Sequence, residues 1–253
     1  MPVTIGDIYK LINDLAPFSL QEEWDNADIL AGSASLPVER VLCALDLNFS
    51  VLKEAKEKNV QLIVTHHPIL FRGRKNLRED DVEGRLLCEL IRSRIALIAA
   101  HTNYDSAQPG VNDALAKALG LTDVLALEGG VRMGTAGERT LGAFRARAEA
   151  SLGGVVRMYG EAEREICRVA VLGGAGGDYY PIAKAAGADV FLTGEIAHHK
   201  AWDAYQDGMC ILEAGHAATE LPAISTLADG LQNAANGVKW NLKVFESQAE
   251  LFR

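Results

Sequence analysis

All six histidines of this 253-residue chain follow runs of apolar residues that have the length and composition of buried β-strands. Each of four such runs leads into a segment that carries one or two histidines: Val60–Thr65, Ile95–Ala100, Asp189–Thr193 and Met209–Leu212. In an open α/β sheet, ligands bind at the carboxyl ends of the strands. Histidines together with carboxylates suit divalent first-row metals, so this placement predicts metal chemistry.

Helical patterns separate these strands and predict an α/β fold made of two lobes. The first half has a β-α-β-α-β order, so we expect parallel strands joined by right-handed crossovers. After Leu121, frequent glycines interrupt the pattern, and Thr140–Ala148 and Gly154–Tyr159 resemble short antiparallel strands. The alternation then resumes at Cys167–Leu172. We therefore expect two α/β lobes with mixed sheets and the metal site between them: residues 1–125 plus about 221–253, and residues 126–220.

The bulk composition argues against several classes of function. A formal charge of −9 disfavours nucleic acid as the main partner, because a phosphate backbone attracts basic patches. No apolar run approaches the roughly 20 residues of a membrane helix, and the N-terminus lacks the features of a signal peptide. We therefore expect a cytoplasmic protein with no membrane partner. The four cysteines form no Cys-x-x-Cys pair and are predicted to be core thiols.

Two histidine segments have spacings that suit a metal ion. If a helix starts after Gly215, His216 and Glu220 lie one turn apart on one face. They can then reach one ion, or Glu220 can span two; the alternative is a polar helix start without a ligand. In an extended chain, His66 and His67 point to opposite sides. They suit two neighbouring metals, or one of them is a bystander.

Other polar residues leave more alternatives open. His101 and Asp105 lie in a predicted loop, where Asp105 is either an oxygen ligand or a turn residue. His101 is a ligand, a residue that orients a ligand, or a general acid or base. Glu195, His198 and His199 either face a substrate or are solvated residues at a helix start. The Gly173–Asp178 loop fits neither a dinucleotide fingerprint nor a P-loop and reads mainly as a tight turn. The segment Trp24-Asp25-Asn26 either packs in the core or caps a helix.

Taken together, these segments resemble a known family, the dinuclear-metal-centre, ring-hexamer proteins called GTP cyclohydrolase 1 type 2 homologs. The resemblance runs from about residue 4 to residue 250 and rests on seven motifs in one order: Glu23–Asn26, Ala44–Asp46, Val64–Phe71, His101-x-x-x-Asp105, Leu172–Asp178, Thr193–His199 and Ala214–Glu220. The chain looks like the compact form that lacks a mid-chain insert. It departs from many relatives at Ala27-Asp28, where they carry Val-Gly.

The resemblance implies a toroidal homohexamer with two divalent transition-metal ions per subunit (Zn, Fe, Mn, Co or Ni). The implied ligands are His66, His67, Asp105, His216 and Glu220, with Glu220 bridging the ions. His101 matches a position that lines the site.

The charge of this implied ligand set suggests a function. Its two carboxylates supply −2 against +4 from two divalent ions, which favours an anionic ligand. Paired metals are used by phosphatases to activate water. The leading hypothesis is a metal-dependent hydrolase acting on a nucleotide or another phosphorylated small molecule, with His101 or Glu195 as the catalytic proton-transfer residue. The alternative is a metal-handling or regulatory ring protein without dedicated catalysis; a third possibility is redox chemistry at a di-iron centre.

Overall fold

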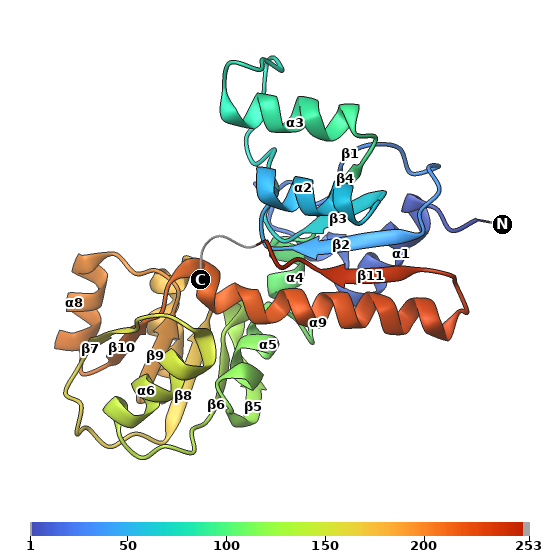
Figure 1. Cartoon of the computed structure of the whole chain (residues 1–253). Coiled ribbons are helices and arrows are strands. Elements are labelled where there is room, and N and C mark those ends of the chain that lie inside the picture. The colour runs from blue at the N-terminus through green and yellow to red at the C-terminus, as the bar shows by residue number, and fades with distance from the viewer. Residues whose placement is uncertain (1, 250–253) are drawn as a thin grey trace. The chain divides into compact units, whose positions relative to one another are not determined.

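A computed structural model describes residues 2–249, which form two compact mixed α/β units (Figure 1). Unit 1 contains the described chain up to Ala107 and from Ile224 on, and unit 2 contains Gln108–Ala223. The first boundary lies before the expected position near residue 125. The reason is that helix α5 (Val111–Ala118) places Leu115 in the same hydrophobic core as Val169, which belongs to the sheet of unit 2.

The sheet of unit 1 has five strands in the order β1-β4-β3-β2-β11. Their bounds are β1 Ile29–Ala31, β2 Arg40–Ala44, β3 Leu62–Thr65, β4 Ala96–Ala99 and β11 Lys243–Glu246. The neighbours from β4 to β11 are parallel, as the β-α-β pattern predicts, and β1 joins the edge antiparallel to β4. The carboxyl ends of β3 and β4 therefore lie side by side at one edge of the sheet.

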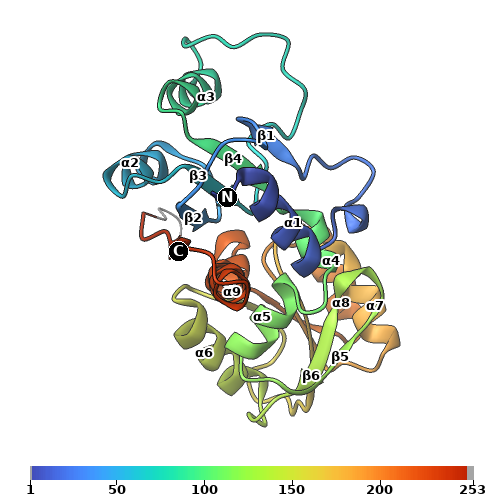
Figure 2. The ribbon, with the colours of Figure 1, turned by 90° about the vertical axis from the view of Figure 1, so that its right-hand side faces the viewer.

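Helices cover both faces of this sheet (Figure 1, Figure 2). Helices α2 (Phe49–Glu57) and α3 (Val82–Arg92) lie on one face, where they share a core with β2, β3 and β4. Helix α1 (Ile5–Leu15) and the later turns of α9 (His216–Gly237) lie on the other. Thr4 and Asp7 form a capping box at the start of α1.

The sheet of unit 2 has six strands in the order β5-β6-β8-β9-β10-β7. Their bounds are β5 Thr122–Ala126, β6 Arg132–Thr135, β7 Arg157–Tyr159, β8 Arg168–Leu172, β9 Val190–Thr193 and β10 Cys210–Glu213. Strands β8, β9 and β10 are parallel, and the remaining pairs are antiparallel. Two mixed sheets confirm the predicted fold class.

Four helices pack on the two faces of this second sheet. α5 and α6 (Leu141–Leu152) share one core with it. α7 (Tyr180–Ala185) and α8 (His198–Gln206) share the other. The prediction of a strand at Thr140–Ala148 is wrong, because these residues begin α6. Thr140 caps this helix, and its buried residues recur at helical spacing: Leu141, Phe144, Ala148 and Leu152.

The cysteines only partly follow the expectation of core thiols. Cys43 and Cys210 are buried, whereas Cys167 is exposed where it precedes β8. Burial raises the pKa of the Cys43 thiol. Among the described residues, no helix is long and apolar enough to cross a membrane.

A buried ion pair stabilises unit 2. The Arg132 side chain is 2 % exposed and donates two hydrogen bonds to Asp113, at 2.8 and 2.9 Å. Asp113→Ala leaves this guanidinium buried without its carboxylate, so we expect the free energy of unfolding to fall by about 3 to 5 kcal/mol. Denaturant titration measures this loss. As a control, Asp207→Ala breaks an exposed pair with Lys184 and should cost less than about 1 kcal/mol; equal losses would contradict the prediction.

Candidate metal site

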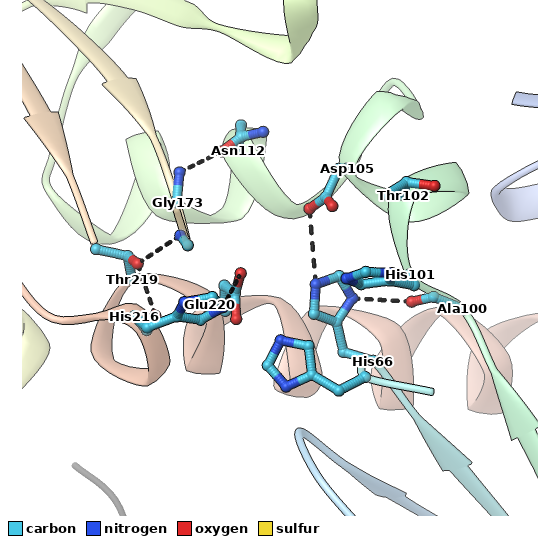
Figure 3. Close-up of polar contacts among 12 residues, drawn as sticks. His66, Ala100, His101, Thr102, Asp105, Asn112, Gly173, His216, Thr219 and Glu220 are labelled. Atoms are coloured by element: carbon cyan, nitrogen blue, oxygen red, sulfur yellow. Dashed lines mark hydrogen bonds and ion pairs between the residues drawn. The ribbon is translucent and has the colours of Figure 1, made fainter. Parts of the chain in front are cut away.

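Three histidines of unit 1 come together where two neighbouring strands end. His66 and His67 directly follow β3, and His101 follows β4, which pairs with β3 in parallel. One ring nitrogen of each histidine lies within 4.8 Å of a ring nitrogen of the other two. Figure 3 shows His66 and His101 beside each other. Imidazole nitrogens gathered this closely could hold a metal ion together.

Each of these imidazoles is oriented by a hydrogen bond from its Nδ1. His66 Nδ1 donates to the carbonyl oxygen of Ala100 at 2.8 Å. His67 Nδ1 donates to Asp46 at 2.9 Å, and His101 Nδ1 donates to Asp25 at 2.7 Å. Since carbonyl and carboxylate oxygens only accept, the proton lies on Nδ1 and the lone pair on Nε2. This pattern is typical of histidines that bind metals through Nε2.

Asp105 belongs to the same cluster, although the segment is not the loop that we expected. Residues Thr102–Ser106 form the short helix α4, with His101 at its N-cap. The amide of Asp105 donates to the carbonyl oxygen of His101 at 3.0 Å, so the two residues lie one turn apart. Asp105 Oδ1 lies 3.6 Å from His66 Nε2 (Figure 3). Asp105 therefore places a carboxylate oxygen, a candidate metal ligand, beside His66.

Asp25, for which the sequence left packing and capping open, orients a histidine of the site. Its side chain has no exposed area and accepts hydrogen bonds from His101 Nδ1, the amide and hydroxyl of Thr102, and the amide of Asn26. Burial alone would raise the pKa of this carboxyl, but the bonds from His101 and Thr102 outweigh it and hold the pKa well below its usual range. A permanent carboxylate thus fixes the His101 ring.

Unit 2 carries a second group of candidate ligands at the start of α9. His216 and Glu220 lie one turn apart, as the spacing predicts, with His216 Nε2 3.3 Å from Glu220 Oε1 (Figure 3). Glu220 is buried, with an exposed fraction of 5 %. Between them, Thr219 accepts a hydrogen bond from the amide of Gly174 at 3.0 Å. This bond ties the loop after β8 to the first turn of α9.

Of the other predicted residues, Glu195 lies near this second group, whereas His198 and His199 begin α8. Glu195 Oε1 lies 3.4 Å from His216 Nδ1, so Glu195 can orient the His216 ring much as Asp25 orients His101. Glu195 is itself exposed. His198 and His199 begin α8, as expected, and are both exposed. Of these three described residues, Glu195 is the one that contacts a candidate ligand.

Gly174 brings the backbone close to Glu220, and this closeness can be tested. Its φ of +60° favours glycine, and an added Cβ would collide with Glu220 Oε1. Gly187 has a φ of +82° but open space around it, so Gly187→Ala measures backbone strain alone, about 1 to 2 kcal/mol. Gly174→Ala must also push the end of the Glu220 side chain aside, so it should lower the free energy of unfolding by more than Gly187→Ala does. Denaturant titration compares the two, and equal losses would mean that Glu220 is not crowded.

The chain is similar to proteins of one known family over most of its length. A model of the family Duf34/NIF3 (NGG1p interacting factor 3) matches residues 3–251. Proteins called GTP cyclohydrolase 1 type 2 homolog from Clostridium perfringens and Streptomyces coelicolor are each 34 % identical. The first alignment covers 89 % of this chain and 90 % of the relative, and the second covers 96 % and 91 %.

Solved structures show the same fold. A hypothetical protein of Staphylococcus aureus superposes with a TM-score of 0.95 at 31 % identity, over 100 % of this chain and 99 % of that one. A Bacillus cereus protein related to NIF3 gives 0.96 at 25 % identity over the same shares. The resemblance inferred from the sequence motifs is confirmed.

Proposed function

Because this chain belongs to the Duf34/NIF3 family, we propose that it binds two divalent transition-metal ions and hydrolyses a nucleotide or another phosphorylated small molecule. The observation that carries the proposal is the shared orientation of His66, His67 and His101, each of which donates from Nδ1 and keeps its lone pair on Nε2. Metal-binding histidines almost always donate their other ring N–H in this way, which sets the tautomer and the orientation of the ring.

The ligands follow from the resemblance of the sequence motifs and are part of the proposal. The residues that would hold the ions are His66, His67, Asp105, His216 and Glu220. A set of imidazole nitrogens and carboxylate oxygens suits zinc, iron, manganese, cobalt or nickel and disfavours calcium, which prefers oxygen alone. His101 lies with His66 and His67, so it is either a further ligand or the group that moves a proton.

When bound, such a metal pair lowers the pKa of a water molecule and stabilises charge on a leaving oxygen. Asp25 holds the proton of His101 on Nδ1, so in a proton-transfer role Nε2 of His101 would be the atom that accepts a proton from water and returns it to the leaving group. Glu195 orients His216 through Nδ1. The proposed ligands carry two negative charges against four positive ones, and this excess favours an anionic substrate such as a phosphate ester.

Metal removal and restoration test the proposal. Protein stripped with a chelator should regain about two ions per chain on dialysis against Zn²⁺ or Mn²⁺, measured by inductively coupled plasma mass spectrometry. Reloaded protein, screened against nucleotides and simple phosphoesters, should release phosphate or nucleoside, and stripped protein should not. The hydrolase proposal is wrong if no reloaded form turns over any of these compounds. Rapid transfer of the ions to an apo-protein acceptor would then favour metal handling.

We also propose that the protein assembles as a homohexamer, in keeping with its family resemblance. Size-exclusion chromatography with light scattering should give a mass near six times the 27.2 kDa of the chain. A monomeric or dimeric mass at micromolar concentration would contradict this proposal.

A further inference from the structure

Two large aromatic side chains of unit 1 remain exposed next to the histidine cluster. Trp24 is 59 % exposed and Phe71 is 47 % exposed. Their ring centroids lie 5.7 Å apart, and the His101 ring lies 6.2 Å from the indole and 6.1 Å from the phenyl ring. The three rings therefore form one group, the aromatic cluster, which joins solvent-exposed apolar surface to a candidate metal site.

Hydrogen bonds next to each ring hold this cluster in place. Asp25, which follows Trp24, is anchored to His101 and Thr102. The side-chain amide of Asn26 donates to the carbonyl oxygen of Leu70, which precedes Phe71, at 2.7 Å. The segments that carry the indole and the phenyl ring are thus tied to each other and to the His101 turn. Because these backbone segments are already anchored, a ligand that packs on their rings need not order them, and less entropy is lost on binding.

We propose that Trp24 and Phe71, which pack edge to face at an interplanar angle of 66°, form a two-walled stacking platform for a planar heteroaromatic ring, the base of a nucleoside phosphate. The platform deepens the proposed hydrolase function and rests on it, because it adds a base subsite beside the metal ligands. Exposed rings bind bases of any sequence through their π faces. Their contact with His101 puts such a base next to the site of its anionic group. The acidic chain disfavours a nucleic-acid strand, so the ligand is a mononucleotide.

Tryptophan fluorescence tests this platform without any need for turnover. The chain has three tryptophans, so Trp202→Phe combined with Trp240→Phe leaves Trp24 as the only indole. This protein, metal-loaded, is titrated with guanosine 5′-monophosphate and, separately, with ribose 5-phosphate, which has the phosphate but no base. N-acetyltryptophanamide corrects for absorption by the base. We expect saturable quenching by the nucleotide and none by ribose 5-phosphate.

A matched pair of substitutions locates the effect. Phe71→Leu removes one wall of the platform and should weaken nucleotide binding at least about fivefold in Kd, the smallest change expected from the loss of one stacking partner. Phe49→Leu is the control, because Phe49 is another exposed phenylalanine of unit 1, on α2, at 38 %. It should leave the Kd unchanged. Metal content and circular dichroism confirm that both variants fold and load.

Three results would overturn the platform. The first is equal affinity for ribose 5-phosphate and the nucleotide, and the second is equal effects of Phe71→Leu and Phe49→Leu. The third is a change in oligomeric mass in Trp24→Leu with no change in nucleotide affinity measured by isothermal titration calorimetry, which would make the aromatic pair a contact between copies of the chain. Quenching without hydrolysis supports the platform and defeats only the hydrolase proposal. Hydrolysis at the same rate with and without a base supports the hydrolase proposal and defeats the platform.

Discussion

Glu220→Gln should fold normally and yet lose at least one metal ion per chain, together with any phosphoester hydrolysis. The substitution keeps the size of a side chain that is only 5 % exposed, so the packing at the start of α9 is preserved. It removes the negative charge that the proposed bridging ligand contributes beside His216. Loss of a residue that merely orients a ligand costs about 10- to 100-fold in metal affinity, and loss of a bridging ligand should cost at least the upper value.

The control for this variant is Glu213→Gln. Glu213 is a partly buried carboxylate of the same unit, but it pairs with Arg157 at 2.9 Å rather than with a histidine. Metals per chain after dialysis, and phosphate release by the reloaded proteins, are measured for both variants beside the parent. Full metal occupancy in Glu220→Gln would remove Glu220 from the ligand set. Equal loss in the two variants would show a general effect of charge on unit 2.

Asp25→Asn should lower the stability of the metal-free protein by about 3 kcal/mol at neutral pH. The carboxylate is fully buried and accepts charge-assisted hydrogen bonds from His101 and Thr102, and an amide of the same shape loses that charge. The amide also relaxes the preference of His101 for a proton on Nδ1. We therefore expect metal affinity or the pH profile of hydrolysis to change as well. Denaturant titration and metal competition measure the two effects.

The stability difference between the parent and Asp25→Asn should depend on pH in one direction. The pKa of Asp25 is depressed in the folded protein, so the carboxylate stabilises the fold fully above the ordinary aspartate pKa of about 3.9. This stabilisation is lost as pH falls toward the folded pKa. Over that range the unfolded state takes up a proton on Asp25 and the folded state does not, so the unfolded state is favoured. The difference in free energy of unfolding between the parent and Asp25→Asn should narrow below about pH 4. Asp28→Asn, at an exposed aspartate of the same segment, is the control for removal of a nearby charge. A stability gap between the parent and Asp25→Asn that stays constant with pH would contradict the assignment.

Much of the fold follows from patterns that are local in the sequence. The apolar runs before His66 and His101 are buried parallel strands, and the i, i+4 spacing of His216 and Glu220 lies on a helix as predicted. Errors arose where local signals competed. Thr140–Ala148 alternates well enough for a strand, but the spacing of Leu141, Phe144 and Ala148 suits a helix equally, and packing against the sheet of unit 2 selects the helix. The polar residues after His101 are typical of a loop, so the short helix α4 was not predicted.

The sequence by itself determined which residues stand at strand ends, because burial and periodicity act over a few neighbouring residues. Only the tertiary structure decided how the imidazoles are oriented. Asp25 and His101 lie 76 positions apart, and Asp46 and His67 lie 21 apart, yet each pair forms a hydrogen bond. Such bonds depend on which strands become neighbours and on the paths of the loops that follow them. Those features arise from the packing of the whole sheet, and no local run of residues encodes them.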